Sequence, residues 1–177
     1  MTTIINADNG VSSGSAGLKQ TADTSGVLVL QSSGSTAITI NTDLTTAFTT
    51  TLRETPNVQA VAMATSLNFD VITQSILYYT TNATANSSIN FRGNATTSLN
   101  TMMTTGQSIS VVFMNTNGAT AYYLTTFTID GTSVTPKWQG GTAPTSGNAS
   151  AIDTYVFTII KTASATYTVL ASQTQFK

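Results

Sequence analysis

The chain has 177 residues and a formal net charge of −1, and only 7% of its residues are charged, against roughly 25% in an average soluble protein. Because it contains neither histidine nor cysteine, histidine-dependent catalytic triads, disulfides and thiolate metal sites are excluded. The six basic residues are scattered singly, so there is no basic patch that could attract nucleic acid or an anionic membrane.

Threonine, serine, asparagine and glycine take the place of charge as the polar part of the surface. A surface of hydroxyls and amides can pack against copies of itself without the cost of desolvating ions. A low charge also gives a free monomer little colloidal repulsion. We therefore expect a subunit of a larger assembly. The alternative that the composition leaves open is a secreted β-domain with an uncharged polar surface.

Residues 1–41 predict an extended attachment segment that contains a hairpin. The first 25 residues are rich in glycine, serine and asparagine, and such segments usually order only against a neighbour. The candidate attachment contacts are the isolated apolar residues Ile4, Ile5, Val11 and Leu18. Two apolar runs around the turn at 32–35 predict a hairpin, which alone is only marginally stable in water. We expect it to pack on the C-terminal domain or on another subunit.

Residues 42–66 are predicted to connect this segment to the domain that follows. The range is rich in threonine, and Pro56 disfavours a helical conformation at Thr55. The run from Val58 to Ala64 is too short to distinguish a strand from a helix. We therefore interpret the whole range as a connector.

The region 67–177 predicts a series of antiparallel strands. Short β-branched and aromatic runs alternate with Asn-Gly and Asp-Gly turns and with a Gly/Pro/Ser loop, which is typical of such strands. The expected strands cover 68–72, 75–80, 88–92, 109–114, 122–129, 134–138, 152–160 and 167–170. Their even spacing predicts an all-β protein with an antiparallel, jelly-roll-like β-sandwich as its C-terminal domain. The polar loop 94–105 allows one helical turn.

No targeting or membrane segment is predicted. The N-terminus lacks both the charged region and the apolar core of a signal peptide. No run approaches the ~20 apolar residues that a membrane-spanning helix needs. We expect the protein to be made in a cytoplasm and to reach its final place by assembly, without membrane insertion.

The chain from Ile89 onward resembles a domain found in tail fibres and related appendages of tailed phages. The residues that carry this resemblance are 89–91, 106–113, 117–119, 134–144 and 151–157. The stretches 9–19 and 26–28 are also similar to the start of many marine-phage structural proteins. The resemblance covers about two thirds of the chain and leaves out the connector 42–66.

What the resemblance implies is a β-sandwich subunit of a virion, assembled as a homotrimer in the host cytoplasm. Members of this class occur as host-contacting appendages and as parts bound to the capsid or the tail, and both positions stay open. The expected function is therefore that of a short fibre, appendage or decoration protein, with capsid or tail proteins as partners. The alternative is a receptor-binding adhesin that recognises a host-surface glycan or protein.

Residues that could carry catalysis are sparse. The seven acidic residues stand apart in the sequence, so neither a catalytic carboxylate pair nor a calcium-binding loop is predicted. We expect no catalytic residue, no metal and no cofactor, and we do not expect an enzyme. Asp130 is interpreted as a turn residue, and Asp153 as an acceptor for loop backbone N–H groups.

Aromatic residues and loops are the remaining candidates for recognition. In the pairs Tyr78-Tyr79 and Tyr122-Tyr123, strand alternation predicts one buried and one exposed ring, and cross-strand packing is favoured over ligand binding. The candidate interface or ligand contacts are Tyr79, Tyr122, Tyr123, Trp138, Gln139 and Thr142. For Trp138, packing in the core or in a subunit interface is favoured over ligand contact. If a host ligand binds, the loops 139–150 and 94–105 are its predicted site.

Overall fold

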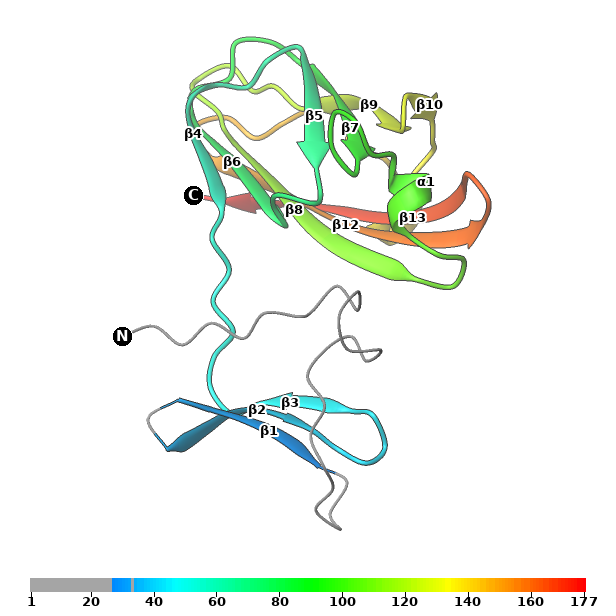
Figure 1. Cartoon of the computed structure of the whole chain (residues 1–177). Helices are drawn as coiled ribbons and strands as arrows, with labels where there is room; N and C mark the ends of the chain where they lie inside the picture. The colour runs from blue at the N-terminus through cyan, green and yellow to red at the C-terminus, as the bar shows by residue number, and fades with distance from the viewer. Residues whose placement is uncertain (1–26, 33) are drawn as a thin grey trace. The chain divides into compact units, whose positions relative to one another are not determined.

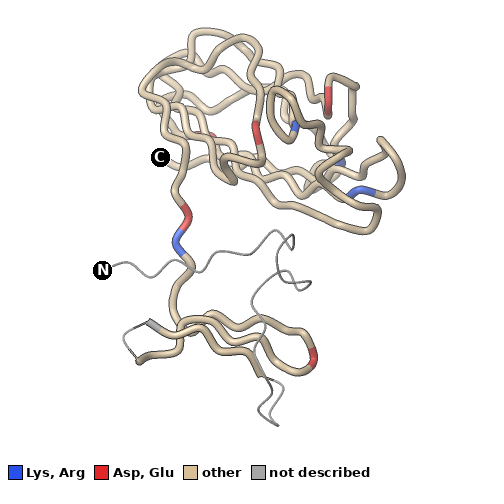
Figure 2. The backbone as a smooth tube through the Cα atoms, in the orientation of Figure 1, with Lys and Arg blue, Asp and Glu red and all other residues tan. Residues whose placement is uncertain are grey.

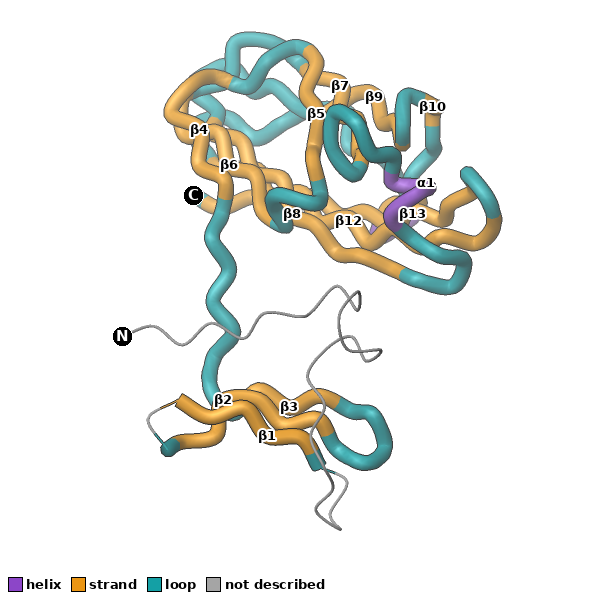
Figure 3. The backbone as a smooth tube through the Cα atoms, viewed as in Figure 1, coloured by secondary structure: helices purple, strands orange, loops and turns teal. Residues whose placement is uncertain are grey.

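The computed structural model describes residues 27–32 and 34–177 (Figure 1). The chain divides into two compact units between Arg53 and Glu54. Nearly all regular structure in the described residues is β-strand (Figure 3), so the prediction of an all-β protein is confirmed. No described helix is long and apolar enough to cross a membrane. The candidate attachment contacts Ile4, Ile5, Val11 and Leu18 lie outside the described residues.

The first unit contains a three-stranded antiparallel sheet in the order β1-β2-β3. Its strands are β1 (Leu28–Ser32), β2 (Ser35–Ile40) and β3 (Thr46–Phe48). The turn between β1 and β2 places Gly34 at a φ of 76°, a left-handed conformation that glycine adopts without steric cost. The two predicted apolar runs therefore pair with each other, and β3 joins them from the range that we expected to be a connector.

The second unit contains two further sheets, whose orders are β10-β9-β7-β5 and β11-β13-β12-β8-β6-β4. The strands are β4 (Asn57–Ala62), β5 (Ser66–Asp70), β6 (Ile76–Thr81), β7 (Ser87–Arg92), β8 (Ser108–Thr116), β9 (Leu124–Ile129), β10 (Thr132–Ser133), β11 (Lys137–Trp138), β12 (Ile152–Ala163) and β13 (Thr166–Phe176). One helical turn, α1 (Leu99–Met102), lies in the loop that allowed it, and a short 3₁₀ turn, η1 (Gln139–Gly141), follows β11.

From β4 to β9 the chain winds as a flattened coil. Successive strands alternate between the six-stranded and the four-stranded sheet, so the neighbours within each sheet run parallel. The prediction of antiparallel strands is wrong for these pairings, because each connection crosses to the opposite sheet instead of turning back beside its own strand. It is confirmed for β12, which pairs antiparallel with β8 and β13 (Figure 1).

The predicted connector also contributes a strand to the second unit. Residues 57–62 form β4, which lies at the edge of the six-stranded sheet and pairs in parallel with β6. The register joins Asn57 to Leu77 and Val58 to Tyr78. A run too short to show its own periodicity thus becomes a strand because β6 supplies hydrogen-bond partners. This pairing comes from tertiary structure and could not be read from the run itself.

The hydrophobic core of the second unit lies between its two sheets. Five aromatic side chains with no solvent exposure contribute to it: Phe69, Phe91, Phe113, Tyr155 and Phe157. The rings of Phe91 on β7 and Phe157 on β12 meet edge to face with centroids 4.9 Å apart, which joins the two sheets. Such pairs add to the stabilisation that burial of apolar area already gives.

The in-register strands of the four-stranded sheet also align polar side chains. The amide of Asn90 donates to Asn68 Oδ1 (3.0 Å), and Thr128 Oγ1 donates to Asn90 Oδ1 (2.9 Å). Two residues further along, on the same face, Arg92 Nε lies 2.6 Å from Asp70 Oδ1. Parallel pairing therefore aligns polar side chains that can bond to one another, and the outer face of this sheet is stabilised by side-chain bonds as well as by backbone hydrogen bonds.

Candidate assembly surfaces and loop sites

The sheet of the first unit has an apolar face that no other described element of that unit covers. Cross-strand partners lie on the same side of a sheet, and the register pairs Leu28 with Ile40, Leu30 with Ile38, and Ile38 with Phe48. Leu30 is 41% exposed and Phe48 is 50% exposed. None of the side chains whose burial is described in residues 27–53 is buried. A small sheet with one apolar face needs a partner to bury that face.

The outer face of the six-stranded sheet is the second candidate assembly surface. It presents apolar side chains between rows of threonine and serine, and four of the apolar ones are substantially exposed: Val58 (56%), Val156 (38%), Leu170 (44%) and Phe176 (56%). Lys137, in register with Leu170, is the one charged residue among the paired, described residues of this face. Figure 2 shows the charged positions of this unit scattered singly along the backbone.

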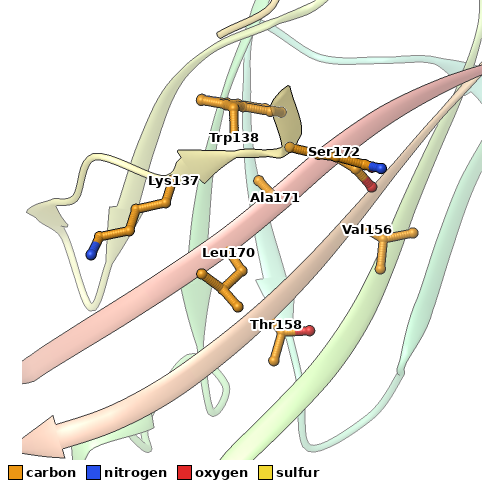
Figure 4. A pocket seen from close by; sticks show the side chains of 8 residues that line it. Lys137, Trp138, Val156, Thr158, Leu170, Ala171 and Ser172 are labelled. Carbon is orange, nitrogen blue, oxygen red and sulfur yellow. The ribbon is translucent and has the colours of Figure 1, made fainter. Parts of the chain in front are cut away.

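A shallow hollow of about 370 Å³ lies on this face beside β11. Val156, Leu170, Lys137 and Gln139 are among the residues that line it (Figure 4). Trp138 borders the hollow, but it pairs in register with the buried Ala171 and therefore points to the inner side of the sheet. Two of the six predicted contacts, Trp138 and Gln139, thus meet at one place.

The ring of Trp138 packs in the core. Its centroid lies 5.5 Å from that of Phe127 and 6.4 Å from that of Phe157, both edge to face. This geometry agrees with the core packing that we favoured over ligand contact. Gln139 and Thr142 are exposed on either side of a turn in which Gly140 and Gly141 have φ values of 77° and 81°.

The predicted tyrosine contacts lie away from this hollow. Tyr79 on β6 packs against the core with its ring 6.0 Å from that of Phe113, and burial raises the pKa of its hydroxyl. Its neighbour Tyr78 pairs with Val58 on the outer face, so the alternation predicted for this pair is present, although both rings are half-buried. Tyr79 is therefore a core residue rather than an exposed contact.

Tyr122 and Tyr123 lie in the loop before β9, so the prediction that they stand in a strand is wrong. Side-chain amides hold their backbone: Asn117 Oδ1 accepts from the Tyr122 N–H (3.1 Å), and Asn86 Oδ1 accepts from the Tyr123 N–H (3.1 Å). Both rings are half-buried against the core. An aromatic run resembles a strand in sequence, but here amide side chains take the place of the strand partner.

A buried polar network fixes the loops at this end of the second unit. Asp153 has no solvent exposure, and its carboxylate accepts from Asn117 Nδ2 (3.0 Å) and from the Asn148 N–H (2.9 Å) and Nδ2 (2.6 Å). The interpretation of Asp153 as an acceptor for loop backbone is confirmed. A Cβ on Gly147 would lie 2.3 Å from the Tyr122 carbonyl oxygen, so only glycine fits beside the network.

At the opposite end, α1 links two hairpin turns. Asp130, in the β9–β10 turn, accepts from the N–H groups of Leu99 (2.7 Å) and Asn100 (2.9 Å). Asn100 Oδ1 in turn accepts from the Ala165 N–H (2.8 Å) in the β12–β13 turn. Buried Lys161 donates to the carbonyl oxygens of Asn100 (2.6 Å) and Met103 (2.8 Å). Opposite charges at the two ends suit the dipole of even a short helix.

Asp130 is a turn residue, as predicted, with a φ of 50°. Its role in holding α1 was not predicted, because Asp130 and Leu99 are 31 positions apart in the sequence. The start of α1 itself is indicated in the sequence by Ser98. Its hydroxyl accepts from the Thr101 N–H (3.0 Å) as a helix N-cap. Nothing in the sequence indicated that Lys161 would be buried at the other end.

The described residues hold no cluster of three or more acidic side chains that could bind a metal ion. We found no protein-family model, no curated protein and no solved structure that matches the chain.

Proposed function

We propose that this chain is a structural subunit of a phage virion: a short fibre, an appendage or a decoration protein. It assembles with copies of itself, as a homotrimer, through the N-terminal unit. The two facing sheets of the second unit act as a β-sandwich that is presented at the surface of the particle. The virion context comes from the resemblance of residues 89–157 to tail-fibre domains, and the assembly role comes from the exposed faces.

The observation that carries the assembly role is the apolar face of β1–β3, which no other described element of the first unit covers. Five large apolar side chains share it, and none is buried. Within the described residues 27–53 the charged residues are Asp43 and Arg53, so this surface offers little to a charged partner. An identical face on another copy matches it without desolvating ions.

The outer face of the six-stranded sheet supports the same function. Its exposed apolar residues alternate with hydroxyl side chains, and Lys137 is the one charge among its paired, described residues. Interfaces are depleted in charge at their centre. This face is therefore suited to lateral contacts with neighbouring subunits or with other virion proteins.

The test is the mass of the purified chain, measured by light scattering after size exclusion. A homotrimer is expected. The double variant Leu30→Thr/Phe48→Thr, which keeps β-branched residues in the strands but makes the face polar, is expected to lower the mass to that of a monomer. The matched control is Val61→Thr, an exposed apolar residue in β4, which leaves the trimer intact.

A monodisperse monomer of the wild-type chain would overturn the self-assembly part of the proposal. A trimer that survives the double variant would place the interface elsewhere, with the outer face around Val156 and Leu170 next to test. Virion context is tested separately: a chain that lacks residues 1–53 should not incorporate into particles.

The second candidate function is a receptor-binding adhesin for a host-surface glycan or protein. The observation that favours it is a polar pocket between the β9–β10 and β12–β13 turns. Loops carried by a rigid scaffold are common places for recognition. Saturable binding of the purified protein to host cells is the expected result for this candidate.

A further inference from the structure

The pocket between the two hairpin turns has features of a small-molecule site. It measures about 280 Å³, just below the roughly 300–1,000 Å³ of typical ligand pockets. One wall comes from residues 129–135 and the other from 165–167. Figure 1 shows these turns at the end of the second unit that lies away from β4 and from the C-terminus.

The walls of this pocket are held in place by α1. Asp130 in one wall binds the N-terminal N–H groups of α1, and Asn100 of α1 binds the Ala165 N–H in the other wall. Lys161 fixes the opposite end of α1 from within the unit. A pocket whose two walls are tied through one element is preorganised, which lowers the entropic cost of binding a ligand.

The polar lining consists almost entirely of hydroxyl groups. The polar residues that line the pocket are Asp130, Thr132, Ser133, Thr135, Thr166 and Tyr167. No lysine or arginine is among the lining residues, so a phosphate, a sulfate or an acidic sugar would meet the carboxylate of Asp130 without a compensating cation. The chemistry favours a neutral ligand that itself carries several hydroxyl groups.

Tyr167 contributes an aromatic ring to this site, and its hydroxyl group lies beneath the surface. Its hydroxyl oxygen is shielded from solvent and has no hydrogen-bond partner among the described residues. Burial, with a contribution from the charge of Asp130, raises its pKa, so the phenol remains a proton donor. Buried donors without a partner are rare because they cost free energy. The face of the Tyr167 ring is the part of this side chain that suits a sugar ring.

We propose that this pocket binds a single ring of a neutral saccharide, with Tyr167, Ser133 and Thr135 as its contacts. This inference rests on the second candidate function, receptor binding, and names the class of ligand for it. It does not depend on the assembly role. The hydroxyls of Ser133 and Thr135 exchange hydrogen bonds with those of the sugar, and the ring of Tyr167 lies against its face.

The experiment is a ¹H–¹⁵N NMR titration of the full chain with three neutral probes: galactose, glucose and N-acetylglucosamine. N-acetylneuraminic acid serves as the anionic comparison. At least one neutral sugar is expected to give saturable shifts confined to the amides of 130–135 and 165–167. The anionic sugar is expected to bind at least about tenfold more weakly, because like charges repel in the pocket.

Variants separate a specific site from a general effect. Tyr167→Leu keeps an apolar side chain and removes the aromatic face, and it should weaken binding about fivefold. The pair Ser133→Ala/Thr135→Val should weaken it at least as much. Thr158→Val, in the hollow on the outer face, is the matched control and should have no effect. The wild-type spectrum, retained in each variant, shows that the fold is intact.

The proposal is overturned if none of the three sugars shifts these amides, if the shifts fall beside Gln139 instead, or if both pocket variants bind as the wild type does. Tighter binding of N-acetylneuraminic acid than of the neutral sugars would also overturn it. The oligomeric state is measured in the same samples, so a monomeric protein that binds sugar, or a trimer that does not, distinguishes this inference from the assembly proposal.

Discussion

The three-stranded sheet of the first unit and the two sheets of the second unit differ in how far they bury their apolar side chains. In the second unit, side chains such as Phe91 and Phe157 are fully buried between two sheets of one chain. In the first, Leu30 and Phe48 share a face that remains about half exposed. The two regions have similar strand patterns in the sequence, yet the second unit buries its apolar side chains and the described residues of the first unit bury none.

This difference shows that a sequence pattern can predict strands without indicating whether the chain itself buries the apolar face of the sheet. A sheet becomes stable when something covers its apolar face, and the second unit supplies that cover from its own chain. In the first unit, the described residues form three short strands and no further element that could lie on them. Its folding is therefore expected to be linked to association, with an apparent stability that depends on protein concentration.

The largest expected effect contrasts one phenylalanine from each unit. Phe91→Ala should destabilise the second unit by about 3–5 kcal/mol, because it removes a fully buried ring and leaves a cavity. Phe48→Ala should change the same transition by less than about 0.5 kcal/mol. Urea unfolding followed by the fluorescence of Trp138, the single tryptophan, reports on the second unit alone. Equal effects of the two variants would contradict the separation of the units.

A smaller effect is expected from the buried network. Asp153→Asn replaces one acceptor oxygen with a donor that faces the donors of Asn117 and Asn148. The loss should be about 1.5–3 kcal/mol, the range for hydrogen bonds to charged groups, in the same urea experiment. Asp43→Asn, in the exposed turn before β3, should leave the transition unchanged. A stable Asp153→Asn protein would show that the network is dispensable.

The next smaller loss of stability is expected at α1, whose two ends are held by Asp130 and Lys161 (the α1 clamp). Lys161→Met keeps the apolar stem but leaves the carbonyl oxygens of Asn100 and Met103 without their donor, and the expected loss is about 1–3 kcal/mol. Amide hydrogen exchange should rise at Met102 and Met103, whose N–H groups bond within the turn. Lys137→Met, on the outer face, should change stability by less than about 0.5 kcal/mol. Comparable losses from the two lysines would contradict the clamp.

The last prediction is a response to pH that is confined to alkaline solution. Burial raises the pKa of Tyr79, Tyr155 and Tyr167 above the ordinary value of 10.0. The unfolded chain therefore loses these protons first, so stability is complete below about pH 10 and falls as the pH rises above it. Between pH 6 and 8 stability should be flat, because no histidine is present. Thermal unfolding at pH 7, 9 and 11 measures both parts.

Much of the strand content could be predicted from local pattern. The runs that became β6, β7, β8 and β12 have strong β-branched or aromatic character, and their positions in the sequence agree with those in the structure. The sequence also allowed one helical turn in the loop 94–105, and the structure has it at Leu99–Met102. These elements depend on neighbours a few residues away, so the sequence carries their signal.

Long-range pairing was not predictable in the same way. β4 exists because β6 lies beside it, and the parallel order follows from connections that cross between sheets. Asp130 and Lys161 became the ends of one clamp although they come from different hairpins. The tyrosines at 122–123 were assigned to a strand because aromatic side chains favour strands, whereas amide side chains hold them in a loop. Pattern alone gives no information on such partners.

The flattened coil has a consequence for how this chain folds. Asn57 pairs with Leu77, and Ser66 pairs with Ser88, so these first turns close over roughly 20 residues at a modest entropic cost. Tyr79 pairs with Asn115 only after a loop of nearly twice that length, and Ile152 with Thr116 after a similar one. The coil can therefore form turn by turn from its N-terminal side, and β12 and β13 add last. During synthesis, all the residues that pair in these first turns leave the ribosome before the strands that complete the core.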